Sequence, residues 1–329
     1  EEAARAKPGQ PIVLFLQARL LIATGRHKEA VTVLTELLEI DPESSVSRVL
    51  LADAHLQMGG VQNARETLSN VLRQYPDDVP ALAMMTKVEI LSGNLDQALR
   101  HTRRIQQQYP ELYLGYQLQG DVWVAKKNDV EADRQYAQAW ERMPRSELAI
   151  RRAEVMLRTD KKEAAVEPLL SWLGDHPGDA RVRRFLATTY HNTGRDKQAI
   201  AEYLNVLAVN PDDVAALNNL AWLYFQANDP GARAMAEHAH RLDPDNPGVL
   251  DTYGWILVHQ GDVNKGTKLL RQASRQLPDV PEISYHYAVA LHLSGDQQQA
   301  GEMLEALLVN GKSFDSREHA RQLLEEIRG

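Results

Sequence analysis

The chain has 329 residues, of which 43% are hydrophobic and 25% charged, a composition typical of a folded protein and too polar for an integral membrane protein. No uninterrupted apolar stretch approaches the roughly 18 residues that a membrane-spanning helix requires. The formal net charge is -8, and residues 100–200, the basic part, hold only 18 Lys and Arg against 14 Asp and Glu, which is far short of the concentrated basic face that nucleic-acid binding requires.

Prolines divide the chain at a nearly constant interval. Successive members of the series are 33 or 34 residues apart: Pro42, Pro76, Pro110, Pro144, Pro177, Pro211, Pro244 and Pro278. Self-similarity at this period is typical of a repeat array, in which each unit packs only against its neighbours.

Each period predicts two helices joined by a tight turn. A small residue stands twelve positions before each proline: Ala30, Ala64, Ala98, Ala132, Ala165, Ala199, Ala232 and Gly266. A second series of small residues, broken only by Thr86, comprises Ala18, Ala52, Gly120, Ala153, Ala187, Ala221, Gly254 and Ala288. The turn residues between the two series are Gly25, Gly59, Gly93, Lys127, Asp160, Gly194, Asn228, Gly261 and Gly295. Small residues allow two helices to cross closely, glycine supplies a left-handed turn, and proline ends the second helix, so repeat boundaries are predicted near residues 44, 78, 112, 145, 179, 213, 246 and 280.

The two ends differ from the repeats between them. Pro8 lies 34 residues before Pro42, so residues 1–10 are interpreted as the tail of the second helix of a truncated preceding repeat. Residues 315–329 are predicted to form a capping helix, with its apolar side made by Ala320, Leu323, Leu324 and Ile327. These features suggest a fragment from the C-terminal part of a longer repeat protein.

Three phrases complete the pattern: TGRHKEAVTVLTELLEIDPE, TGRDKQAIAEYLNVLAVNPDD and SGDQQQAGEMLEALL. Together with the period and the two small-residue series, they resemble the tetratricopeptide repeat (TPR) family over essentially the whole chain. The resemblance implies an all-α, right-handed α-solenoid of about nine helix-turn-helix repeats over residues 11–314. It also implies that the first helix of each repeat lines a concave groove.

Motifs for catalysis are missing from the sequence. It contains no cysteine, no Gly-rich phosphate loop, no His-Glu-x-x-His pair and no Gly-x-Ser-x-Gly elbow. His238 and His240 are two positions apart, hence on different faces of a helix, and are expected to face solvent rather than to share a metal ion. We therefore expect no enzymatic activity, no cofactor and no metal site.

The predicted binding surface is a stripe of outward-facing residues on the first helices of the last four repeats, at spacing i, i+4, i+7 around the small residue. Tryptophan and tyrosine are frequent binding anchors, and they alternate with polar residues here but not in the early repeats. The candidate groove residues are Arg184, His191, Asn218, Asn219, Trp222, Gln226, Asp251, Trp255, His259, Tyr285 and His292. The alternative is that Trp222 and Trp255 pack against the neighbouring helix.

Residues 251–324 look like the end of bacterial TPR lipoproteins that accompany exosortase and PEP-CTERM sorting with exopolysaccharide production. The resemblance is carried by Asp251–Trp255, Pro281–His286 and Gly311–Phe314. It implies a periplasmic location, with outer-membrane anchoring through a lipidated N-terminus that this sequence lacks. A cytoplasmic location is the alternative.

The function expected from these features is that of a protein-interaction scaffold in a bacterial envelope system. Its partner would be a peptide or a protein domain held in the concave groove, with no role for nucleic acid and no direct membrane span. Direct glycan binding along the aromatic groove is the alternative from another class. A third interpretation is a regulatory TPR domain of a larger enzyme.

Overall fold

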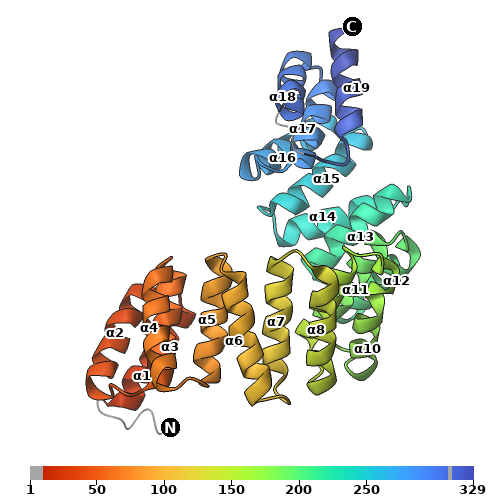
Figure 1. Ribbon diagram of the computed structural model, residues 1–329. Coiled ribbons are helices and arrows are strands. Elements are labelled where there is room, and N and C mark those ends of the chain that lie inside the picture. Colours follow the sequence, from red (N-terminus) through yellow and green to blue (C-terminus); the bar gives the residue numbers. More distant parts are fainter. Residues whose placement is uncertain (1–9, 310–312) are drawn as a thin grey trace. The chain divides into compact units, whose positions relative to one another are not determined.

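The computed structural model describes residues 10–309 and 313–329, and over this part of the chain it is entirely helical (Figure 1). The described residues form nineteen α-helices and one 3-10 helix, and none of them is in a strand. The chain divides into two compact units, Glu1–Pro177 and Gly178–Gly329, which are described separately. The helix tail expected at residues 1–10 lies outside the described residues, except for Gln10. Gly311, the first residue of one C-terminal motif, lies outside them as well.

Unit one is a stack of helix pairs. Its helices are α1 (Pro11–Ala23), α2 (His27–Ile40), α3 (Ser45–Gln57), α4 (Val61–Gln74), α5 (Val79–Leu91), α6 (Leu95–Gln108), α7 (Tyr113–Ala125), α8 (Asp129–Arg142), α9 (Ser146–Met156), the 3-10 helix η2 (Lys162–Val166) and α10 (Glu167–Asp175). Each α-helix packs against the next, and α1, α3, α5 and α7 also contact one another in succession.

Unit two has the same organisation. Its helices are α11 (Ala180–Asn192), α12 (Asp196–Val209), α13 (Val214–Gln226), α14 (Ala232–Leu242), α15 (Pro247–His259), α16 (Val263–Gln276), α17 (Pro281–Leu293), α18 (Gln297–Val309) and α19 (Arg317–Arg328). Helix α19 packs on α18 through buried Ala320 and Leu324. The division of the chain into nine repeats and the capping role of α19 remain our proposals.

The predicted turns are confirmed, but one helix pair is irregular. The six turn glycines have φ between 72° and 92°, and Lys127 (58°) and Asn228 (55°) adopt the same left-handed conformation without being glycine. Asp160 also lies in a turn, but it is not among the described non-glycine residues with positive φ. Its helix pair is irregular, because α9 ends early at Met156 and the chain passes through η2 before α10 begins.

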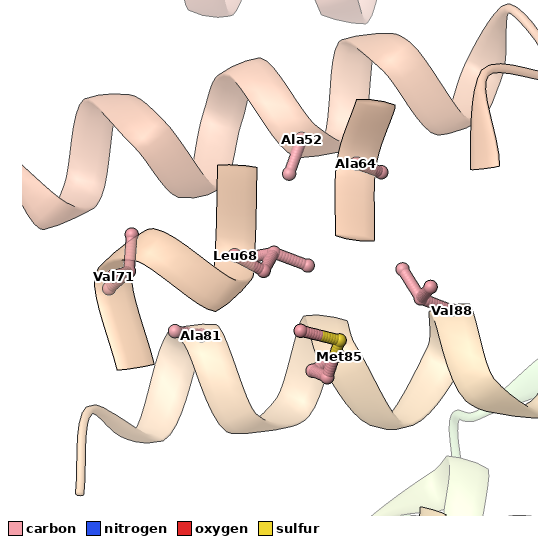
Figure 2. Close-up of a cluster of buried hydrophobic side chains, with 7 residues drawn as sticks. All are labelled: Ala52, Ala64, Leu68, Val71, Ala81, Met85 and Val88. Carbon is pink, nitrogen blue, oxygen red and sulfur yellow. The ribbon is translucent and has the colours of Figure 1, made fainter. Parts of the chain in front are cut away.

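The two small-residue series lie where helices cross. Figure 2 shows one such crossing in unit one, where Ala52 of α3 and Ala64 of α4 meet Leu68, Val71, Ala81, Met85 and Val88. Thr86, the exception in the second series, is fully buried and donates its hydroxyl hydrogen to the carbonyl of Leu82 at 2.8 Å. A polar side chain is tolerated there because its own helix satisfies it. No helix within the described ranges is long and apolar enough to cross a membrane.

Candidate functional site

All the candidate residues lie in unit two, on its odd-numbered helices. Three of these helices begin at a side-chain cap: Asp179 before α11, Asp213 before α13 and Asn246 before α15 each accept a hydrogen bond from a backbone N–H of the first turn. The caps fix where each helix starts, and hence which face it turns toward its neighbours.

Four of the candidates meet at one pocket of about 190 Å³ formed by α11, α12, α13 and α15. They are His191, Asn218, Asn219 and Trp222, and the rest of the lining consists of Thr188, Tyr203, Leu223 and Thr252. The pocket is smaller than a typical site for a drug-sized ligand, so it suits one side chain or one small ring. Its wall combines an indole ring with amides and hydroxyls.

A chain of hydrogen bonds forms part of the pocket lining. The Thr188 hydroxyl donates to the backbone carbonyl of Arg184 at 3.1 Å, so its oxygen accepts from the Tyr203 hydroxyl at 2.9 Å. The Tyr203 oxygen in turn accepts from Nδ2 of Asn219 at 3.0 Å. Burial raises the pKa of Tyr203, so its hydroxyl stays protonated at neutral pH and these hydrogen bonds are kept.

Asn218, beside this chain, is not satisfied in the same way. Its Oδ1 atom is buried and accepts no hydrogen bond from any described residue. A buried amide oxygen without a donor destabilises a fold by about 1–3 kcal/mol, so such atoms are uncommon and require an explanation. The side chain of Asn218 is one of those that line the pocket.

A second group of candidates gathers around a histidine that the stripe did not include. His286 of α17 is 4% exposed, and its Nδ1 lies 2.9 and 3.0 Å from the two carboxylate oxygens of Asp251 on α15. Its ring stacks on Trp255, with centroids 4.0 Å apart, and lies 6.2 Å from Trp222. We call Asp251, Trp255, Tyr285, His286 and His259 the His286 cluster.

The remaining members of the His286 cluster cover Trp255. The His259 ring is 4.1 Å and the Tyr285 ring 6.1 Å from the Trp255 ring. Burial, followed by the charge of Glu282, raises the pKa of Tyr285. Trp255 thus has three rings around it, those of His259, Tyr285 and His286. Trp222 lies next to His286 and also lines the pocket.

Three candidates join neither the pocket nor the His286 cluster. Arg184 forms an ion pair with Asp213, the cap of α13. His292 hydrogen-bonds Gln297 at 2.7 Å through Nδ1, which links α17 to the start of α18. Gln226 is exposed at the end of α13. All three positions fit the helical spacing, but Arg184 and His292 are bonded to residues outside the two groups, and Gln226 is exposed.

The residues that the sequence analysis missed share a position in the repeat. His286 and Thr252 stand two residues before the small residue of their helices, as Asn219 does. Side chains at this position reach back toward the preceding repeat: Asn219 reaches Tyr203 of α12, and His286 reaches Asp251 of α15. A stripe drawn only through positions i, i+4 and i+7 omits them. Tyr203 could have been noticed because the equivalent positions of five other repeats hold leucine.

The two histidines of α14 do not face solvent as expected. His238 is half-buried, with Nε2 3.0 Å from a carboxylate oxygen of Asp212, and the half-buried His240 ring packs 5.4 Å from the Tyr253 ring. The expectation is wrong because α13 and α15 flank α14 and cover both faces. Over residues 10–309 and 313–329, no group of three or more His, Asp or Glu side chains is arranged to hold a metal ion.

Comparisons with known proteins match parts of the chain to two repeat families and one further domain. Two family models described as tetratricopeptide repeat match residues 21–88 and 186–247, and a model described as bacterial transcriptional activator domain matches residues 120–214. The chain is similar in fold to a tetratricopeptide repeat protein from Parabacteroides merdae, with a TM-score of 0.50 and 13% identity over 85% of this chain and 98% of that one. It is also similar to a chain of the APC/C hetero-tetramer Cut9–Hcn1, with a TM-score of 0.51 and 15% identity over 86% of this chain and 56% of that one.

The sequence relatives are bacterial and much longer than this chain. TPR repeat-containing protein PA4667 of Pseudomonas aeruginosa is 25% identical over 73% of this chain and 35% of its own length. Cellulose synthase operon protein C of Pseudomonas fluorescens and cellulose synthase 1 operon protein C of Komagataeibacter xylinus are each 24% identical over 80% of this chain, which spans 19% and 18% of their lengths. The family models show tetratricopeptide repeats over residues 21–88 and 186–247, and the structural neighbours share the helical-repeat fold of the chain.

Proposed function

We propose that the chain is a non-enzymatic interaction scaffold, and that unit two binds a peptide or a partner domain across α11, α13, α15 and α17. The observation that carries this proposal is the pocket beside Trp222, where an indole ring, two asparagines and hydroxyl groups surround an open space. Amides and hydroxyls suit the backbone of an extended peptide, and the indole offers a large apolar area with few rotors.

The two tryptophans have different parts in this proposal. Trp222 is half-buried and lines the pocket, so a bound chain would contact it directly. Trp255 is stacked on His286, so in this proposal it packs beneath the binding surface rather than serving as the anchor. Truncating an anchor in a pocket generally costs about 2 kcal/mol or more, which corresponds to about thirtyfold in affinity, whereas contacts at the rim contribute little.

We further propose that this scaffold serves an exopolysaccharide system of the bacterial envelope. Two relatives are named for cellulose synthase operons, which supports a polysaccharide setting. The C-terminal motifs Asp251–Trp255 and Pro281–His286 support the narrower assignment to the lipoproteins of exosortase and PEP-CTERM sorting. Because the chain spans about a third or less of these relatives, a regulatory TPR domain of a larger enzyme is the alternative.

Direct glycan binding is the second candidate for the same surface. The observation that favours it is the indole ring of Trp222 beside neutral amides and hydroxyls, a combination that could also receive a sugar ring. A peptide is the better supported ligand because the aromatic and polar residues extend over successive odd-numbered helices, which an extended chain can cross.

The test is a selection of random peptides displayed on phage against the complete 329-residue chain, with a panel of neutral oligosaccharides as the second arm. Enriched peptides should bind Trp222→Ala at least about tenfold more weakly than the wild type. Trp123→Ala is the matched control, because Trp123 is half-buried but packs in unit one. Circular dichroism should show unchanged helicity in both variants. Peptides that bind Trp222→Ala normally, or oligosaccharides that alone require Trp222, would contradict the proposal.

A further inference from the structure

The pocket beside Trp222 is electrically neutral although charges lie close to it. None of the described residues that line it is a lysine, arginine, aspartate or glutamate. Charged residues on the helices that form the pocket have other partners: Arg184 pairs with Asp213, and the Asp251 carboxylate accepts from Nδ1 of His286. The pocket therefore offers no counter-charge to an incoming ion, which would have to lose its hydration without compensation.

The ring of His191, which also lines the pocket, is held by a hydrogen bond. Its Nδ1 lies 2.7 Å from a carboxylate oxygen of Asp196 at the start of α12, so Nδ1 carries the hydrogen and donates it.

The hydrogen-bonding capacity of the lining is unevenly used. Thr188, Tyr203 and Asn219 satisfy one another in a directed chain that ends on a backbone carbonyl. Asn219 keeps the second hydrogen of its Nδ2, because the bond to Tyr203 uses only one. Asn218 keeps a buried acceptor, Oδ1, with no donor among the described residues. Nδ2 of Asn218 and Oδ1 of Asn219 also form no hydrogen bond with a described residue, so the two neighbouring amides keep both donors and acceptors.

We propose that this pocket receives a primary carboxamide side chain, asparagine or glutamine, of the bound partner; the inference rests on the scaffold function proposed above. The carboxamide presents a donor and an acceptor to the amides of Asn218 and Asn219, which offer both. Trp222 and Leu223 supply apolar wall for the methylene groups of the side chain. A carboxylate or an ammonium carries a charge that no lysine, arginine, aspartate or glutamate of the lining balances, so both are disfavoured.

The first test uses small probes of defined chemistry with the complete chain. N-acetylglutamine methylamide is titrated at neutral pH, and binding is followed by the indole N–H signal of Trp222, assigned with Trp222→Phe. The matched probes are the glutamate compound, which replaces the amide by a carboxylate, and the norvaline compound, which has no polar end. We expect the glutamine probe to bind at least about tenfold more tightly than either. Equal binding of the three probes would overturn the inference.

The second test uses Asn218→Leu, a variant of similar volume. Because the Asn218 oxygen has no partner in the described chain, its removal should raise the urea midpoint of unfolding while the glutamine probe loses at least about tenfold in affinity. The inference fails if Asn218→Leu binds the probe as the wild type does. It also fails if the midpoint falls, because Oδ1 would then have a structural partner.

The two proposals fail in different ways. Peptides selected on the chain that require Trp222 but carry no preferred asparagine or glutamine would overturn the carboxamide inference and leave the scaffold function standing. A glutamine probe that binds through Asn218, when no displayed peptide requires Trp222, would overturn the scaffold function while the chemistry of the pocket holds. The peptide selection and the probe titration thus decide the two questions separately.

Discussion

Gly266 of α16 stands at a close crossing of α15 and α16 in unit two, and we predict that Gly266→Ala destabilises the protein. A Cβ atom at this position would lie 2.6 Å from the carbonyl oxygen of Gly254 on α15 and 2.6 Å from Cγ2 of Val258. It would also lie 3.0 Å from the backbone nitrogen of Val258. Two of these three contacts are with backbone atoms, which cannot rotate away, so α15 and α16 would have to separate.

Two opposing effects set the magnitude. Alanine is favoured over glycine inside a helix by about 0.5–1 kcal/mol, whereas overpacking a tight core costs typically about 1–3 kcal/mol. Because the clash involves backbone on a facing helix, we expect the upper part of that range and a net loss of about 1–2 kcal/mol. Gly301→Ala is the matched control: its Cβ would meet only Cγ2 of Ile327, at 3.5 Å, so the helix preference should dominate and stabilise the protein slightly.

The assay is urea unfolding of the full chain followed by circular dichroism, with hydrogen exchange of peptides from α15 and α16. Hydrogen exchange is needed because stacked repeats can unfold in parts, and a single midpoint then mixes them. We expect Gly266→Ala to lower the midpoint and to speed exchange in these two helices. If Gly266→Ala unfolds at the same or a higher urea concentration than the wild type, or if Gly301→Ala is equally damaging, the reasoning from the close crossing is refuted.

Two further predictions concern other packing sites of unit two. Ala199→Leu should overpack the crossing at fully buried Ala199 and cost about 1–3 kcal/mol, and a change in urea-derived unfolding free energy within about 0.5 kcal/mol of zero would contradict it. Burial, followed by the charge of Lys265, holds the pKa of His240 below its usual value, so the unfolded chain binds the proton more readily and stability falls as the pH drops below about 6.5. His240→Phe should weaken this loss when unfolding midpoints are compared at about pH 7.5 and about pH 5.5; an unchanged pH dependence would count against it.

The sequence predicts the fold well because helix crossings impose simple demands. The spacing of Ala18, Ala52 and their equivalents reports that helices approach closely there, and only small residues allow that approach. The sequence did not predict that the pair α9 and α10 is irregular. Asp160 has the spacing of the other turn residues, although its backbone φ is not positive. The spacing of residue types along the sequence predicts where a turn lies. The conformation of that turn also depends on where the preceding helix ends.

The proposed binding surface could be predicted only as a set of residues on successive odd-numbered helices. Helical spacing correctly placed Asn218, Trp222 and Trp255 on the odd-numbered helices of unit two, but it carried no information on which side chains touch. The hydrogen bonds of Asn219 and Arg184 depend on Tyr203 and Asp213, which come from other elements. Contacts between repeats depend on the side chains of both neighbouring helices. A spacing pattern along a single helix therefore cannot predict them.

The contrast between the two tryptophans follows from one repeat position. Trp222 and Trp255 both stand one residue after the small residue of their helices, so the helical spacing treats them alike. The residue that faces each from the next odd-numbered helix stands two before the small residue, and it is Thr252 beside Trp222 but His286 beside Trp255. The imidazole is large enough to stack on the Trp255 ring, whereas threonine is too short to fill the space beside Trp222. The side chain at this position thus distinguishes the two sites: a ring packs on Trp255, whereas a pocket remains beside Trp222.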